Sequence, residues 1–189
     1  MCLESCLMKN PYLKVNPVYI DGSNVAYSRF NELKKPILSD ILLIYDYLIN
    51  NLEFKLEKIH CICDPTLKYY IDKPIEYQAL IREGVIIEAP KVADEFILGF
   101  AFKHDFCFII SNDRFRNYIE QLPSKQWLEI RRISFMIIDN EVCLSPNINF
   151  EKLQTFNEIS LKRVLLKQEI TTLGILNKIE KAEGELNLF

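Results

Sequence analysis

The sequence predicts an α/β fold with a doubly wound, mostly parallel sheet, because short apolar runs alternate with segments of helical periodicity. Strands that alternate with helices form parallel sheets through right-handed crossovers. In addition, two of the apolar runs, VYID and FCFIISND, end in small polar residues and an acid, as strands do at a ligand-binding sheet edge. At 189 residues and 49% hydrophobic composition, the chain suits one such domain with an appendage.

The expected elements alternate along most of the chain. Strands are expected at residues 18–20, 59–63, 85–88, 106–111, 134–138 and 142–144, and helices at 39–52, 74–83, 94–104 and 114–121. Ser39 is the expected N-cap of the first helix, and Pro74 and Gly84 bracket the second. Asp139 and Asn140 predict a structural turn between the last two strands.

Three acids stand where this topology places ligands. Asp21 and Asp113 follow the first and fourth strands, whose C-terminal ends meet at the switch point of such a sheet. Asp94 falls in the first turn of the helix that directly precedes the fourth strand. Each acid alone is also explained by a turn, a cap or the helix dipole. Together they favour a site for Mg²⁺ or Mn²⁺, because such hard cations prefer carboxylate oxygens.

Four segments carry a family resemblance: IDGSNVA, ADEFILGFAFKHD, FIISNDRFRNY and QWLEIRRISFMIIDNEVCLSP. In order and spacing they resemble the NYN branch of the PIN-like ribonucleases, and most closely the nuclease domain of the Regnase (MCPIP) group of CCCH-zinc-finger ribonucleases. The resemblance runs from about Pro17 to Pro146. The nuclease half of protein-only RNase P is a sister with similar blocks. The resemblance implies a metal-dependent endoribonuclease that hydrolyses phosphodiesters of single-stranded or loop RNA.

The resemblance also implies roles for individual residues. The metal-binding and catalytic acids of the family fall on Asp21, Asp94 and Asp113, with Mg²⁺ or Mn²⁺ as the cofactor. The residues matched to the substrate side of the site, or expected there because they follow Asp113 directly, are Asn24, Ser111, Arg114 and Arg116. Arginine suits a phosphate group because its planar fork donates two parallel hydrogen bonds.

Two positions depart from the family pattern. Ala93 stands where the family usually has the first of two adjacent aspartates, and Asn117 stands where it has a further aspartate. Glu95 is a candidate for the missing ligand, although successive helical residues point in different directions. Two alternative functions therefore stay open: a tRNA 5′-processing nuclease that resembles protein-only RNase P, and a catalytically weakened module for RNA binding or assembly.

Other charged and sulfur-containing residues have plainer interpretations. Asp64, before Pro65, is expected to start a turn, with a peripheral acid of the substrate groove as the alternative. Arg131 and Arg132 are expected to be ordinary surface charges, and the net charge of −3 does not favour nucleic-acid binding by itself. The six cysteines show no paired ligand spacing, so buried thiols in a reducing cytosol are expected rather than a zinc site.

The ends of the chain differ in character from the middle. Residues 1–16 are expected to form an arm, residues 17–146 the PIN-like NYN nuclease domain, and residues 147–189 a helical extension. Apolar residues at spacings of three to five in that extension favour self-association as a homodimer or higher oligomer, with packing on the domain as the alternative. No apolar run approaches a targeting or membrane segment, so a cytoplasmic protein is expected.

Overall fold

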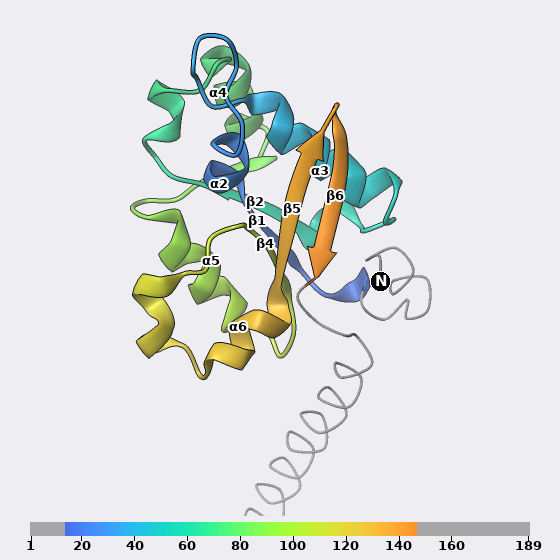
Figure 1. The fold of residues 1–189 in the computed structure, drawn as a ribbon, viewed down its shortest axis with the longest axis vertical. Coiled ribbons are helices and arrows are strands. Elements are labelled where there is room, and N and C mark those ends of the chain that lie inside the picture. Colours follow the sequence, from blue (N-terminus) through green and yellow to red (C-terminus); the bar gives the residue numbers. More distant parts are fainter. Residues whose placement is uncertain (1–13, 147–189) are drawn as a thin grey trace, which may run out of the picture. The chain divides into compact units, whose positions relative to one another are not determined.

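The computed structural model describes residues 14–146, which form a six-stranded sheet with the order β3-β2-β1-β4-β5-β6 (Figure 1). The strands are β1 (Val18–Asp21), β2 (Ile59–Cys63), β3 (Ile86–Glu88), β4 (Phe108–Ile110), β5 (Arg132–Ile138) and β6 (Glu141–Pro146). The first five are parallel, and β6 pairs with β5 in the antiparallel direction. The predicted α/β fold with a mostly parallel sheet is confirmed, including the adjacency of the first and fourth strands.

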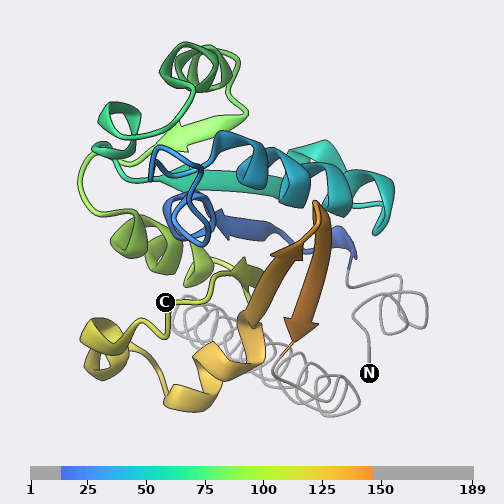
Figure 2. The same ribbon diagram turned by 45° about the horizontal axis from the view of Figure 1, so that its top comes forward.

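Helices cover both faces of the sheet. The α-helices are α2 (Gly22–Ala26), α3 (Leu38–Asn50), α4 (Pro74–Arg82), α5 (Ala93–Ala101) and α6 (Lys125–Arg131), and the short 3₁₀ helices are η2 (Leu56–Lys58), η3 (Leu67–Tyr69) and η4 (Arg116–Gln121). Figure 2 shows α3 and α5 on opposite sides of the central strands. This arrangement follows from strands buried on both faces, whose sequences are therefore almost continuously apolar.

Alternation along the strands decides which residues face α5. Tyr19, Ile62 and Ile109 belong to one buried cluster with Ile97 and Ala101 of α5. Side chains two positions apart share a face of a strand, so Asp21, Asp64 and Ser111 start out on this same side of the sheet. The apolar alternation that builds the core thus directs polar residues at three strand ends toward the N-terminus of α5.

Several local expectations differ from the structure. Helix α3 begins at Leu38 without a side-chain cap from Ser39, because Asp72 Oδ1 accepts the Leu38 N–H at 2.9 Å instead. The α-helix expected at 114–121 is the 3₁₀ helix η4, which follows a left-handed Phe115 with φ of 47°. Helix α6 was not expected, and Ser124 caps it by accepting the Trp127 N–H.

Other local expectations are confirmed. Pro74 lies at the start of α4, and Gly84 follows the helix with a positive φ of 76°. Asp139 and Asn140 both have positive φ, as the two-residue turn of a hairpin requires.

The terminal predictions lie mostly outside the described residues. These are nearly all of the arm at 1–16, the extension at 147–189 and the self-association assigned to that extension. Among residues 14–146, no helix combines the length and apolar character needed to cross a membrane.

Candidate active site

Asp21 lies at the C-terminal end of β1, and its side chain is 3% exposed. One carboxylate oxygen accepts the Asn24 N–H at 3.0 Å, which makes Asp21 the N-cap of α2. The other accepts the Ser111 hydroxyl at 2.8 Å, although the two residues lie 90 positions apart in the sequence. The predicted meeting of strand ends therefore takes the form of a buried hydrogen bond between the residues that follow β1 and β4.

The segment after β4 is bound to its surroundings by its own polar side chains. The Ser111 hydroxyl accepts the Asp113 N–H at 3.0 Å, and Asp113 Oδ1 accepts the Phe115 N–H at 2.7 Å. The Asn112 N–H donates to Asn24 Oδ1 at 2.8 Å. This bond directly joins the segments IDGSNVA and FIISNDRFRNY. These bonds hold Asp113 in a turn beside β1, and they give Asn24 a structural contact within the site.

Asn112 was missed by the sequence reasoning, although it lies between two residues that were singled out. Its side chain donates to the Phe135 carbonyl at 3.0 Å and accepts the Phe135 N–H at 3.1 Å. This two-way contact joins the turn after β4 to the backbone of β5. An amide can both donate and accept, which distinguishes asparagine from aspartate at this position.

Asp94 lies in the first turn of α5, and Asp64 holds the start of that helix. The N-cap position Val92 provides no side-chain acceptor. Asp64, directly after β2, accepts the Ala93 N–H at 2.8 Å, while its own N–H donates to Ser23 Oγ at 2.8 Å. Asp64 is thus more than the start of a turn, because it connects three of the segments around the site. The apolar run that ends in an acid was the available signal.

The carboxylates at this sheet edge repel one another. Burial raises the pKa of Asp21 to about 7, with further contributions from the charges of Asp94 and Asp64 and opposing contributions from its two hydrogen bonds. Burial raises the pKa of Asp94 to about 6, and the charges of Asp113, Asp64 and Glu95 add to it. Asp94 therefore lies within electrostatic range of Asp21, Asp113 and Asp64, and Asp21 lies within range of Asp64.

None of these carboxylates forms an ion pair with lysine or arginine among residues 14–146. Asp21 is buried, Asp64 and Asp94 are partly buried, and Asp113 is exposed. A buried charge without a cationic partner is unfavourable, so Asp21 favours either protonation or a bound cation. The donor set of carboxylate and hydroxyl oxygens suits a hard divalent cation.

The carboxylates do not converge fully, because no group of three or more metal-ligating side chains in the described ranges could hold an ion jointly. Mg²⁺ commonly takes only one or two protein carboxylates and fills its remaining positions with water and substrate oxygens. The residues fit such a sparsely ligated ion by their chemistry.

The positions that depart from the family pattern have different surroundings. Ala93 is 1% exposed and belongs to the apolar cluster under α5, so its side chain points into the core. Asn117 is exposed on η4, and Glu95 is exposed on α5. Room for an additional carboxylate therefore exists at Asn117 but not at Ala93.

Arg114 and Arg116 are both exposed after Asp113. The expectation that Arg131 and Arg132 are ordinary surface charges is wrong. Arg131 is buried, stacks on Trp127 and donates to the Asp105 carbonyl. Arg132 donates to the Ser111 carbonyl at 3.1 Å, and its pKa is lowered first by burial and then by the charge of Arg114. Arg132 and Arg114 thus form a cationic border beside the acids.

Tyr118 is a further residue that sequence reasoning missed. It lies on η4, partly buried against the core cluster. Burial raises its pKa, as do the charges of Asp94, Glu95, Asp64 and Asp113, so its hydroxyl lies near all four carboxylates. No signal in the sequence indicated this, because η4 follows an unpredicted left-handed residue.

The cysteines in the described part of the chain do not form a metal site. Cys61, Cys63 and Cys107 are buried free thiols, as expected, while the free Cys143 is exposed. His60, next to Cys61, stacks on Tyr19 with ring centroids 5.4 Å apart.

Comparisons with known proteins agree with this architecture. The chain resembles two solved structures of the nuclear protein-only RNase P 2 from Arabidopsis thaliana. One shares 17% identity with a TM-score of 0.53, covering 76% of this chain and 33% of that one. The other shares 19% identity with a TM-score of 0.54, covering 77% and 35%. The chain thus spans about a third of the length of these structures, and the likeness concerns the fold. No curated protein sequence matches the chain.

The family described as the Zc3h12a-like ribonuclease NYN domain matches residues 14–155, which contain every site residue considered above. The match spans most of the chain and extends slightly beyond the segment from Pro17 to Pro146 that carries the resemblance. The chain therefore belongs to the Zc3h12a-like ribonuclease NYN domain family.

Proposed function

We propose that this chain is an endoribonuclease that hydrolyses RNA phosphodiesters with the help of Mg²⁺ or Mn²⁺ bound at the site of Asp21, Asp94 and Asp113. One or two of these carboxylates ligate the ion, and water and substrate oxygens fill its remaining positions. The observation that carries this proposal is the buried contact between Asp21 and Ser111, which joins two strand ends near Asp94. Asp21 has no cationic partner among residues 14–146. A carboxylate buried in this way is unfavourable in its ionised form unless a cation compensates its charge.

A divalent ion supplies two things to phosphodiester hydrolysis: it lowers the pKa of a bound water, and it neutralises charge on the phosphoryl oxygens. The residues of the chain provide its place and its surroundings. Asp21 is fixed by hydrogen bonds to both oxygens and serves as the rigid ligand. Asp94 is less buried and carries a pKa of about 6, so it is suited to orient the attacking water.

The substrate phosphate approaches from the side of the turn after β4. Arg114 and Arg116 are exposed there and act as candidates for phosphate contacts. Ser111 and Asn24 act inside the site, where they hold Asp21, Asp113 and Asn112 in position. Their contribution to substrate binding is therefore indirect in this proposal.

The first test is cleavage of labelled single-stranded RNA and of a precursor tRNA by the purified full chain in Mn²⁺, Mg²⁺ or EDTA. We expect metal-dependent cleavage that Asp21→Asn abolishes without unfolding the protein. Asn is close in shape to Asp and removes the unfavourable buried charge. Asp46→Asn is the matched control, because Asp46 is an exposed carboxylate of α3.

The substrate that is cleaved distinguishes an endoribonuclease of single-stranded RNA from a tRNA-processing nuclease. Cleavage of single-stranded RNA supports the proposal, whereas selective cleavage of the precursor tRNA at its 5′ end supports a processing nuclease instead. Cleavage by Asp21→Asn at the wild-type rate contradicts the assigned site.

A catalytically weakened RNA-binding module is the second candidate function. It is favoured by Ala93, whose side chain lies in the apolar core where the family usually has an acid. RNA binding by a folded wild-type chain that cleaves neither substrate supports this module and contradicts the nuclease proposal.

A further inference from the structure

Four aromatic rings are exposed on the segments that follow β1 and β2: Tyr69, over whose ring Lys68 lies, and the three rings Tyr27, Phe30 and Tyr70. Tyr27 is 42% exposed, and Phe30 and Tyr70 are each 58% exposed. Tyr27 and Phe30 contact each other edge to face, with ring centroids 6.2 Å apart. Burial and the neighbouring groups Tyr70 and Asp64 raise the pKa of Tyr27, so these groups lie near its hydroxyl. We call Tyr27, Phe30 and Tyr70 the aromatic surface.

The aromatic surface adjoins the carboxylate site. Tyr27 directly follows α2, the short helix that Asp21 caps. Helix α2 is fixed to the end of β2 because Ser23 Oγ accepts the Asp64 N–H at 2.8 Å. Tyr70 follows β2 through η3. The rings therefore lie at the same edge of the parallel sheet as the acids, since both segments leave the C-terminal ends of neighbouring strands.

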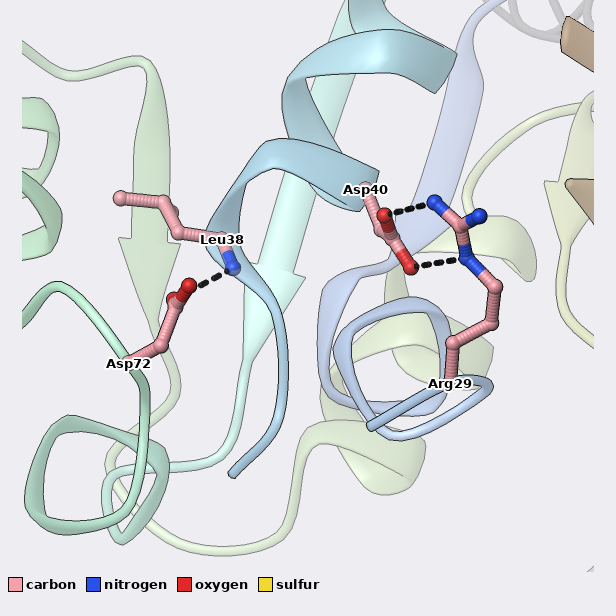
Figure 3. Close-up of polar contacts among 4 residues, drawn as sticks. All are labelled: Arg29, Leu38, Asp40 and Asp72. Carbon is pink, nitrogen blue, oxygen red and sulfur yellow. Dashed lines mark hydrogen bonds and ion pairs between the residues drawn. The ribbon is translucent and has the colours of Figure 1, made fainter. Parts of the chain in front are cut away.

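The loop that carries Tyr27 and Phe30 is held in place. Figure 3 shows Arg29, between the two rings in sequence, making two hydrogen bonds to the buried Asp40 of α3, at 2.9 and 2.5 Å. Figure 3 also shows Asp72 accepting the Leu38 N–H, which ties the segment after Tyr70 to the start of α3.

Backbone contacts reinforce this anchoring. The Asp72 N–H donates to the Pro36 carbonyl at 3.0 Å, and Phe30 and Pro36 form an antiparallel bridge. Asn31 Oδ1 accepts the N–H groups of Leu33 and Lys35, which closes the loop tightly. The rings are consequently presented to solvent by a structured loop, so little conformational entropy is lost when a ligand packs on them.

The same loop carries two exposed lysines. Lys34 and Lys35 are exposed, and neither pairs with an acid in the part of the chain that the structure describes. Lys68, before Tyr70, is already paired with Glu88. Exposed rings close to exposed lysines favour single-stranded nucleic acid as a ligand, because bases stack on the rings while the backbone contacts the cations.

We propose that Tyr27, Phe30 and Tyr70 form a base-binding surface on which an unpaired nucleotide stacks next to the phosphodiester held at the carboxylate site. This inference rests on the proposed ribonuclease function and adds a defined subsite to it. Bases paired in a duplex do not expose their faces, so the subsite requires an unpaired nucleotide. A nucleotide is favoured over a protein partner because the rings adjoin the acids. In addition, Tyr27 and Phe30 share their loop with Lys34 and Lys35, neither of which pairs with an acid among residues 14–146.

The test measures binding apart from cleavage. The full chain carrying Asp21→Asn is titrated into a short single-stranded RNA that contains one 2-aminopurine, whose fluorescence is quenched when it stacks. We expect saturable quenching, and we expect Phe30→Ala and Tyr70→Ala each to weaken binding by about 5- to 150-fold with loss of the quenching. Phe30→Tyr retains a ring and is expected to restore both signals.

A matched control comes from the opposite edge of the sheet. Leu56→Ala removes an apolar side chain of similar exposure, 60%, from η2 at the N-terminal end of β2, and it is expected to bind like the parent. A thermal melt of each variant checks the fold, which exposed positions should leave intact.

The two proposals fail in different ways. Unchanged binding and quenching in Phe30→Ala and Tyr70→Ala, with RNA still bound by the parent, contradict the base-binding surface and favour a protein partner for these rings. The ribonuclease proposal survives that result. Absence of both RNA binding in the parent and cleavage by the wild type contradicts the ribonuclease function itself, and the subsite with it.

Discussion

The Asp64 carboxylate accepts a hydrogen bond from the Ala93 N–H at 2.8 Å, so the residue after β2 holds the helix that carries Asp94. Helix α5 has no side-chain cap of its own at Val92. The start of the helix that carries Asp94 is therefore held by an acceptor that is 29 positions away from Ala93 in the sequence.

We expect Asp64→Ala to reduce cleavage and to lower the free energy of unfolding by about 1 kcal/mol, since an N-terminal helix donor loses its acceptor. Asp64→Asn retains an oxygen acceptor and should restore both stability and most of the activity. Because the Asp64 charge raises the pKa of Asp94, Asp64→Asn should also shift the acidic limb of the pH–rate profile to lower pH. Steady-state kinetics and denaturant melts measure these effects. Equal loss of activity in both variants would show that the charge, not the hydrogen bond, matters.

Stability should depend on pH in a direction opposite to that of an ordinary salt-bridged acid. The pKa of Asp21 is about 7 in the fold against an ordinary value of 3.8, so the folded state binds more protons between these values. Metal-free protein should therefore lose stability as the pH rises from about 4 to about 7, and Asp94 contributes in the same direction. Thermal melts in EDTA across this range measure the slope.

Asp21→Asn provides the control for this pH dependence, because asparagine does not titrate and should flatten most of the slope. Addition of Mn²⁺ should stabilise the wild type more at pH 8 than at pH 5, since the carboxylates must be ionised to bind it. A wild-type slope identical to that of Asp21→Asn would show that Asp21 has an ordinary pKa.

Gly22 should tolerate no side chain. An added Cβ would approach Cys61 Sγ to 2.7 Å, and Cys63 Sγ lies still closer, so the start of α2 would have to move. We expect Gly22→Ala to destabilise the fold by about 1–3 kcal/mol and to reduce cleavage by displacing Asp21. Gly99→Ala is the matched control, because nothing lies within 4 Å of its added Cβ in the helix α5. That variant should be stabilised by about 0.5–1 kcal/mol, and denaturant melts with activity assays compare the two.

We expect an aspartate to be tolerated at Asn117 but to destabilise the fold at Ala93, the two positions where the chain lacks an acid of the family. Asn117→Asp adds an exposed carboxylate near the site, and we expect it to increase the affinity for Mn²⁺ without loss of stability. Ala93→Asp places a carboxylate in the apolar cluster, so it should destabilise the protein by several kcal/mol. Calorimetric Mn²⁺ titration and thermal melts distinguish the cases. A stable Ala93→Asp variant would contradict the position of this side chain.

Local patterns in the sequence were sufficient for the strands and for most helices. The alternation of apolar runs and helical segments predicted the parallel order around β1 and the adjacency of the first and fourth strands. The contact across these strand ends joins Asp21 to Ser111, whereas a meeting of Asp21 with Asp113 stays a prediction. The prediction failed at η4, because the left-handed Phe115 is fixed by the Asp113 side chain and by burial of its own ring. It also missed α6, which begins after its own N-cap Ser124.

The sequence by itself determined the family, the α/β fold and the acids at the strand ends, because these depend on short-range apolar alternation and on contiguous motifs. Only the tertiary structure decided which polar groups form hydrogen bonds to the segments around these acids. Asp64 accepts a hydrogen bond from the start of α5, and Asp72 accepts one from the start of α3. Arg132 donates one to the Ser111 carbonyl. Each bond joins segments that are distant in the sequence. The physical reason is that a hydrogen bond or a buried charge depends on distance in space. That distance is set by the crossovers and packing of the sheet, and no local pattern encodes it.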